Sequence, residues 1–162
     1  MELTFSPPTR ATARAVLAWH YDPPYDLYNA DPAKQADDLA TLLDPANRYY
    51  VAIDDAGDLV GYCCFGADAR VAGGDYGDAA LLDVGLGLRP DLTGGGRGPA
   101  FVGAVLAFGR AALGARHYRL TVAAFNARAI RAYERVGFRA TGQFRRGGRP
   151  DGLEFVLMVE GG

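Results

Sequence analysis

The residues Thr93-Gly94-Gly95-Gly96-Arg97-Gly98 lie between two segments of different pattern. Residues 80–88 before them are apolar on both faces except for Asp83, which predicts a buried central strand. Pro99 after them suits the first turn of a helix that we expect to end at Gly114. Glycine tolerates positive φ angles and leaves bare N–H groups at a helix start, where the helix dipole favours an anion. The stretch predicts either a plain tight connection or a site for a group the size of a pyrophosphate.

Two other kinds of phosphate-binding loop are excluded by the spacing. A nucleoside-triphosphatase loop needs Gly-Lys followed by Ser or Thr, and the only lysine, Lys34, does not follow a glycine. The dinucleotide fingerprint, counted from Gly94 and Gly96, needs a third glycine where Pro99 stands.

The rest of the chain alternates between short strands and helices, with turn residues between them. A second strand pairing is expected between a segment ending near Val71 and one beginning near Ala79, across a glycine-rich stretch. The other expected elements are a strand at 2–5, helices at 10–19 and 32–43, a hairpin at 49–53 and 59–67, a strand at 118–125, a helix from 127 to 136, and strands at 138–144 and 153–159.

Composition and charge narrow the class of protein. With 162 residues, 49% hydrophobic and 22% charged, the chain matches one globular domain. The net charge of -2 argues against a nucleic-acid surface, and no apolar run reaches the ~18 residues of a membrane span. Adjacent Cys63 and Cys64 are expected to be buried free thiols, which fits a reducing compartment. We therefore expect a cytoplasmic protein that binds neither nucleic acid nor membrane.

A second segment carries a more specific pattern. Residues 120–138 read LTVAAFNARAIRAYERVGF. Asn126 can cap a helix after a strand, and Gly137 can end that helix in the left-handed conformation. Taken alone, Tyr133 predicts a packed aromatic one turn after Ala129 and Ile130.

Together, the glycine stretch and residues 120–138 resemble the signature segments of the GNAT superfamily of N-acetyltransferases. The first matches Gln/Arg-x-x-Gly-x-Gly/Ala at both glycines, with Thr93 at the first position, and the second matches strand, Asn cap, Ala-Ile, Tyr, Gly-Phe. The resemblance implies an α/β (α+β) fold in a single domain over residues 1–162. About four helices would flank a mixed, mostly antiparallel sheet of about seven strands, splayed between the fourth, 82–88, and the fifth, 118–125.

The resemblance also implies a site for acetyl-CoA and no metal. The backbone N–H of Leu88 would donate to the acetyl carbonyl, where negative charge grows. Tyr133 would protonate or hydrogen-bond the departing thiolate, and the glycine stretch would bind the diphosphate. Arg128 and Arg131 are either a solvated surface or a contact for the 3′-phosphate. The implied cofactor-binding residues are Leu88, Thr93, Gly94, Gly95, Gly96, Arg97, Gly98, Asn126 and Tyr133.

The group that takes the proton of the attacking amine stays open between Asp83 and an ordered water. Desolvation would raise the pKa of a lone carboxylate in an apolar strand, which would make Asp83 a better base or a substrate carboxylate. Strand alternation places the side chains of Asp83 and Leu88 on opposite faces unless Gly85-Leu86-Gly87 forms a bulge. A structural hydrogen-bonding role is the alternative for Asp83.

The acceptor pocket is expected from the loop 19–29 and the stretch 70–76, which flank the open end of the wedge in this fold. Trp19, Tyr21, Tyr25 and Tyr28 would suit an apolar or cationic amine. A proline-rich loop held by its own aromatic side chains explains the same residues equally well.

Two functions follow from the resemblance. The first is transfer of acetyl from acetyl-CoA to a primary amine of a small molecule or a protein N-terminus, by direct attack in a ternary complex. The second is a non-catalytic acyl-CoA-binding sensor of the same fold.

A homodimer is common in the family. His20 and His117 lack a metal-like grouping and are expected to be structural or exposed.

Overall fold

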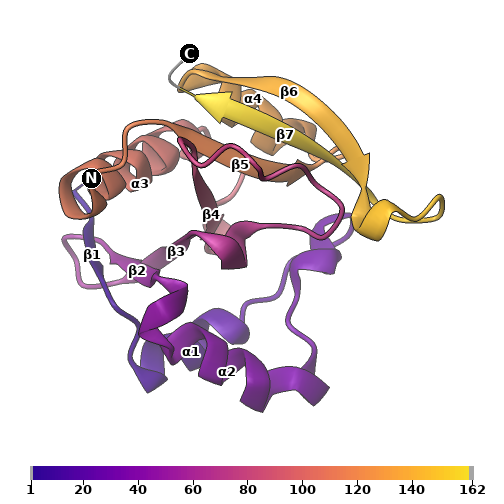
Figure 1. Cartoon of the computed structure of the whole chain (residues 1–162). Helices are drawn as coiled ribbons and strands as arrows, with labels where there is room; N and C mark the ends of the chain where they lie inside the picture. Colours follow the sequence, from indigo (N-terminus) through magenta and orange to yellow (C-terminus); the bar gives the residue numbers. More distant parts are fainter. Residues whose placement is uncertain (1, 161–162) are drawn as a thin grey trace.

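Seven strands and four α-helices form the chain from residue 2 to residue 160, the part that the computed structural model describes. The strands are β1 (Thr4–Ser6), β2 (Tyr49–Ile53), β3 (Leu59–Phe65), β4 (Leu82–Leu88), β5 (Tyr118–Ala123), β6 (Phe138–Arg145) and β7 (Glu154–Glu160). The helices are α1 (Arg10–Leu17), α2 (Gln35–Leu43), α3 (Gly98–Leu113) and α4 (Ala127–Arg135). The strands join in one sheet in the order β1-β2-β3-β4-β5-β7-β6 (Figure 1). None of the helices described is long and apolar enough to cross a membrane.

The capped helix ends lie at or next to the predicted positions, whereas α1 ends at Leu17 and α2 begins only at Gln35, after a 3-10 turn, Pro32–Lys34. Thr9 caps α1 in a capping box. Asn126 caps α4, because its Oδ1 accepts a hydrogen bond from the N–H of Ala129. Gly114 (φ 67°) and Gly137 (φ 104°) adopt the left-handed conformation just after α3 and α4. The two glycines therefore fix where the chain leaves α3 to enter β5 and where it leaves α4 to enter β6.

The parallel contact between β4 and β5 is short. Leu82 pairs with Tyr118 and Asp83 pairs with Arg119, and the register goes no further. Every other pair of neighbouring strands is antiparallel. The two strands therefore separate toward the carboxyl end of β4, which confirms the predicted splay between 82–88 and 118–125.

Strand register assigns the side chains to two faces of the sheet, because residues paired across strands share a face. Phe65 pairs with Val84, and both pack on α3 in the main core; this is the back face. Tyr49 pairs with Cys64, which pairs with Gly85; this is the front face, where Tyr49 packs against the cluster built by α1 and α2. Figure 1 shows α1 and α2 lying apart from α3 and α4.

The segment between β3 and β4 differs from the expected second hairpin. It contains a 3-10 turn, Ala67–Ala69, and no strand, and β3 pairs directly with β4. The predicted pairing near Val71 and Ala79 is therefore wrong. Alanine, glycine and aspartate make up most of this stretch, and the Tyr76 hydroxyl holds it by accepting from the N–H of Val71 at 2.9 Å.

Candidate active site

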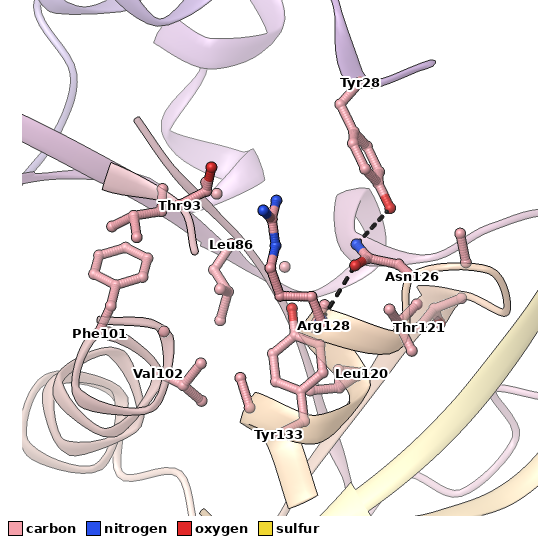
Figure 2. A pocket seen from close by; sticks show the side chains of 18 of the residues that line it. Tyr28, Leu86, Thr93, Phe101, Val102, Leu120, Thr121, Asn126, Arg128 and Tyr133 are labelled. Carbon is pink, nitrogen blue, oxygen red and sulfur yellow. Dashed lines mark hydrogen bonds between the residues drawn. The ribbon is translucent and has the colours of Figure 1, made fainter. Parts of the chain in front are cut away.

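A cavity of about 580 Å³ occupies the space where β5 leaves β4. Its walls come from both strands, the N-terminal end of α3, one side of α4 and the loop 21–28. Figure 2 shows side chains from these elements converging on it. The cavity reaches both faces of the sheet, because Tyr133 of α4 lines it from the back face and Tyr49 and Tyr62 line it from the front face.

One edge of β4 offers backbone groups to this cavity. The N–H of Arg89 donates to Val60 at 2.8 Å, toward β3, while the N–H of Leu82 donates to His117 at 3.0 Å, toward β5. Backbone direction alternates along a strand, so the N–H groups of Leu86 and Leu88 face the gap. The Tyr21 hydroxyl donates to the carbonyl of Leu88 at 2.7 Å, which agrees with this direction. Two N–H donors therefore face the cavity beyond the last β4–β5 pair.

The glycine stretch forms the turn that leads into α3. Gly94 (φ 82°) and Gly96 (φ 76°) have positive φ angles, as the sequence predicts, and Gly98 is the first residue of the helix. Thr93, Gly94, Gly96 and Gly98 line the cavity, whereas Gly95 and Arg97 do not. The start of α3 thus presents bare backbone to the cavity.

Arg128 brings a positive charge to the same place. Its guanidinium lies 4.3 Å from the centre of the Tyr25 ring, and its Nη1 would be 3.5 Å from a Cβ at Gly94. Figure 2 shows this side chain reaching into the cavity from α4. Arg131 and Arg135 also line the cavity from α4. The charge beside the glycine turn is therefore positive, as a phosphate site requires.

Asn126 and Tyr133 project from α4 into the same cavity. Asn126 is buried, and while its Oδ1 caps the helix its Nδ2 donates to the Tyr28 hydroxyl at 3.1 Å. Tyr133 is half-buried, and its hydroxyl end lies among the lining residues in Figure 2. Burial, with a smaller contribution from Tyr28, raises the pKa of Tyr133. Its phenol is therefore neutral, and able to donate a proton or a hydrogen bond, at physiological pH.

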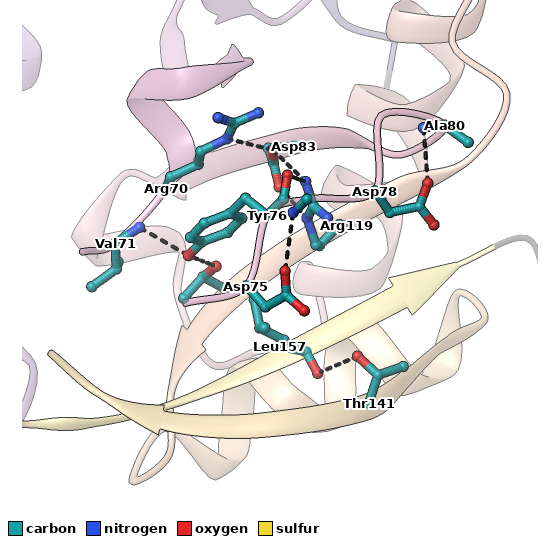
Figure 3. A network of polar contacts seen from close by, with 12 residues as sticks. Arg70, Val71, Asp75, Tyr76, Asp78, Ala80, Asp83, Arg119, Thr141 and Leu157 are labelled. Carbon is teal, nitrogen blue, oxygen red and sulfur yellow. Dashed lines mark hydrogen bonds and ion pairs between the residues drawn. The ribbon is translucent and has the colours of Figure 1, made fainter. Parts of the chain in front are cut away.

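The structure places Asp83 outside the cavity, in a buried ion-pair network (Figure 3). Arg119 donates to Asp83 through Nε at 2.6 Å and Nη2 at 2.9 Å, and Arg70 donates through Nε at 2.8 Å. Asp83 is 2% exposed and Arg119 is 4% exposed. Gly85-Leu86-Gly87 makes no bulge, since β3 and β4 stay in register. Both carboxylate oxygens are engaged, which supports a structural hydrogen-bonding role for Asp83 over that of a base or substrate carboxylate.

The aromatic loop contributes three of its four predicted residues. Tyr21, Tyr25 and Tyr28 line the cavity. Trp19 does not, and its ring packs against Tyr62, with the centroids 6.1 Å apart. Tyr21 is tied to β4 through Leu88, so the loop is anchored at the mouth of the gap.

Three residues that line the front half of the cavity are not among the site residues predicted from the sequence: Tyr49, Tyr62 and Asp68. Tyr62 lies opposite Gly87 in the register, and a Cβ at Gly87 would overlap its ring. Glycines at alternate positions of β4 could have signalled an aromatic side chain on the neighbouring strand. Asp68 gives no such signal, because its position depends on the 3-10 turn after β3.

A model of the Acetyltransferase (GNAT) family matches residues 13–138, which is most of the chain. The match spans the glycine turn and the segment that carries Asn126 and Tyr133. The chain belongs to the GNAT acetyltransferase family. Within the described residues of this GNAT chain, no group of three or more His, Cys, Asp or Glu side chains is placed to hold a metal ion.

Solved structures share the fold over nearly the whole GNAT chain. A chimera of spermidine N-acetyltransferase SpeG from Vibrio cholerae and hSSAT superposes with a TM-score of 0.74 at 20% identity, covering 99% of this chain and 95% of that one. AAC(6')-Ib in complex with ribostamycin and coenzyme A gives 0.72 at 23% identity, covering 99% and 93%. A GNAT phosphinothricin acetyltransferase from Sinorhizobium meliloti in complex with AcCoA gives 0.66 at 21% identity, covering 99% and 88%. No curated protein matches the chain.

Proposed function

We propose that the chain is an acetyl-CoA-dependent N-acetyltransferase acting on a primary amine of a small molecule or a protein N-terminus. The observation that carries this proposal is the gap between β4 and β5. It exposes unpaired N–H groups of β4 between a glycine turn on one side and a neutral tyrosine on the other. This combination supports transfer of an acyl group from a long phosphorylated carrier.

The lining residues fit coenzyme A. Bare N–H groups at the start of α3 and the guanidinium of Arg128 would hold the diphosphate. Asn126 Nδ2, now bonded to Tyr28, would turn to a pantetheine amide. Acetyl-CoA supplies the acetyl group in activated form, as a thioester.

The residues of the gap would then act on the acetyl group in three ways. The N–H of Leu88, with that of Leu86 next along the same edge, would hydrogen-bond the carbonyl oxygen and stabilise its growing negative charge. Tyr133 would donate to the sulfur as the C–S bond breaks. The proton lost by the amine would pass to water, since Asp83 is fully engaged.

Direct attack in a ternary complex is favoured over an acyl-enzyme. Cys64 is the one thiol among the described residues that line the cavity. Burial raises the pKa of Cys64 to about 12, with a smaller effect of the neighbouring Asp68, so its thiol stays protonated and a weak nucleophile at neutral pH. Initial rates should therefore give intersecting lines when both substrates are varied, and Cys64→Ser should keep turnover.

The test is release of free CoA thiol from acetyl-CoA in the presence of a broad panel of primary amines, with mass spectrometry of the acetylated product. We expect amine-dependent thiol release. Absence of release with every amine, while CoA still raises the melting temperature, would replace the enzyme by a sensor that binds acyl-CoA without turnover.

A further inference from the structure

The cavity has a cofactor half and a front half. The cofactor half, on the back face, holds the glycine turn and the arginines of α4. The front half is bounded by Tyr21, Tyr49, Tyr62 and Asp68, which together we call the front chamber. Asp68 is the one carboxylate that lines the cavity within the described part of the chain.

Local structure fixes the position of Asp68 on the wall of the chamber. β3 ends at Phe65, and Gly66, with φ 106°, turns the chain into the 3-10 turn Ala67–Ala69. The N–H of Gly66 donates to the carbonyl of Asp83 at 2.8 Å. Ala69 covers Gly85 of β4, since a Cβ at Gly85 would lie 3.4 Å from the Cβ of Ala69. The turn is thus attached to the strand that borders the gap.

Asp68 has one protein partner and lacks a counter-charge. The hydroxyl of Tyr49 donates to Oδ2 of Asp68. No arginine, lysine or histidine between residues 2 and 160 forms an ion pair with this carboxylate. Its Oδ1 accepts no hydrogen bond from a protein group in the same range, so it is free to accept one from a ligand.

The three tyrosines of the chamber are neutral, and Arg146 is a further charged residue that lines the cavity, with its guanidinium 5.2 Å from the centre of the Phe155 ring. Burial raises the pKa of Tyr49 and of Tyr62, and it raises the pKa of Tyr21 to about 12. All three phenols therefore stay uncharged at physiological pH. Their rings provide apolar contact and attract a cation through the π face.

We propose that Asp68, held by Tyr49, binds the ammonium group of the acceptor, which is a compact amine with an apolar or aromatic body and without a carboxylate beside the nitrogen. This assignment rests on the proposed function and names its substrate class. A carboxylate next to the amine would bring a second negative charge close to Asp68, and two negative charges close together repel each other. Asp68 thereby selects simple amines over amino acids.

The probes are 2-phenylethylamine and phenylalanine, which share a skeleton and differ by the carboxylate. Calorimetric titration in the presence of CoA measures their binding without any need for turnover. We expect Asp68→Asn to weaken 2-phenylethylamine binding roughly five- to tenfold. The wild type should bind phenylalanine more weakly than 2-phenylethylamine, and Asp68→Asn should remove most of this difference.

Two further variants separate a specific role from a general one. Asp26→Asn removes the same charge from a residue that is exposed, as Asp68 is, but does not line the cavity, and it should leave amine binding unchanged. Tyr49→Phe frees Asp68 and should weaken binding in the same direction by a smaller factor. Raising the ionic strength from about 0.05 M to about 0.5 M should weaken binding to the wild type and leave Asp68→Asn nearly unaffected.

An error in the role of Asp68 and an error in the proposed enzymatic function would give different results in these measurements. Turnover with an unchanged amine KM in Asp68→Asn would overturn the role of Asp68 and keep the enzyme. Amine binding that is lost in Asp68→Asn, without turnover in the wild type, would keep Asp68 and overturn the enzyme. Failure of 2-phenylethylamine, tyramine and benzylamine all to bind the wild type, or tighter binding of phenylalanine, would overturn the assignment.

Discussion

Tyr133 has a packed ring and a hydroxyl that lines the cavity. The ring contacts Phe138 edge-on, with centroids 5.9 Å apart and planes at 66°. The same side chain is among the residues that line the gap between β4 and β5. The two interpretations that the sequence allows for Tyr133, a packed aromatic and a proton donor, are therefore compatible.

Replacement of Tyr133 by Phe keeps the packed ring and removes the proposed donor. We expect kcat to fall about 100-fold, the lower range for loss of a general acid, with KM for acetyl-CoA within roughly twofold of the wild type. Steady-state kinetics measures both values. Tyr50→Phe is the matched control, because Tyr50 packs against Phe65 and Phe108 away from the cavity and should keep full activity. An unchanged kcat in Tyr133→Phe would remove the donor role.

The role of a single residue can be predicted from the sequence where the contacts that determine it are local. Asn126 is predicted as a cap because its partner, Ala129, is three residues away. The engagement of Asp83 could not be predicted, since Arg119 is 36 positions further along the chain and meets it through the β4–β5 pairing. Asp68 was missed because a turn, and no periodic pattern, places it.

The three consecutive glycines of the turn before α3 differ in conformation and in their contact with the cavity. Gly94 and Gly96 have positive φ angles and line the cavity, while Gly95 between them does neither. A non-glycine residue in the left-handed region costs roughly 1–2 kcal/mol. The turn therefore offers two sensitive positions and one internal control.

Gly94→Ala and Gly96→Ala should each weaken CoA binding roughly 5- to 30-fold, the equivalent of about 1–2 kcal/mol. Gly95→Ala should change it little, because its Cβ would meet only the flexible end of Arg97. Calorimetric titration with CoA gives the dissociation constants. Equal effects at all three positions would contradict a binding mode that depends on this backbone shape.

The junction of β4 and β5 is fixed by the ion pair between Asp83 and Arg119. Asp83→Asn should lower the free energy of unfolding by about 3–5 kcal/mol, because it leaves the Arg119 charge buried with a weakened partner. Arg70→Gln, at a half-exposed side chain, should cost less than about 1 kcal/mol. Urea unfolding measures both. A fully stable Asp83→Asn variant without activity would return Asp83 to the catalytic site.

Helices and strands were predicted well, because hydrophobic period, caps and glycine stops act within a few residues. The connection between β3 and β4 was not. Its conformation depends on distant partners, such as the hydroxyl of Thr121, 2.7 Å from that of Tyr76, and the N–H of Gly147, which donates to Ala72. Contacts between residues so far apart in the chain leave no period in the sequence.

Several cysteine and tyrosine side chains of the folded chain are buried, some beside the cavity and others in the core. Cys63 is 0% exposed and Cys64 is 4% exposed, and burial raises the pKa of both, that of Cys64 to about 12. Burial likewise raises the pKa of Tyr21 and Tyr118 to about 12. The folded chain therefore keeps protons that the unfolded chain releases in mild alkali.

This difference predicts a loss of stability in alkali. Below about pH 8 both states keep these protons, so the free energy of unfolding is insensitive to them; the thiols of the unfolded chain, with a pKa of about 8.5, ionise first as the pH rises. Between about pH 9 and 12 the unfolded chain loses protons that the folded chain retains, and stability falls by about 1.4 kcal/mol per pH unit for each such group.

Urea midpoints at pH 7, 9 and 10.5 measure this fall. Replacing both Cys63 and Cys64 by Ala should make the decline between pH 9 and 10 shallower, whatever it does to stability at pH 7. A decline of the same slope in the double variant would show that the buried thiols do not contribute.

In the mechanism that we propose, the gap between β4 and β5 holds the thioester of acetyl-CoA. A crystal structure of the chain grown with acetyl-CoA tests it most directly. We expect the diphosphate on the turn 93–98 beside Arg128, and the acetyl carbonyl within hydrogen-bond distance of the N–H of Leu88 or Leu86. The sulfur should lie near the Tyr133 hydroxyl. Coenzyme A bound elsewhere on the surface, with the gap closed by side chains, would contradict it.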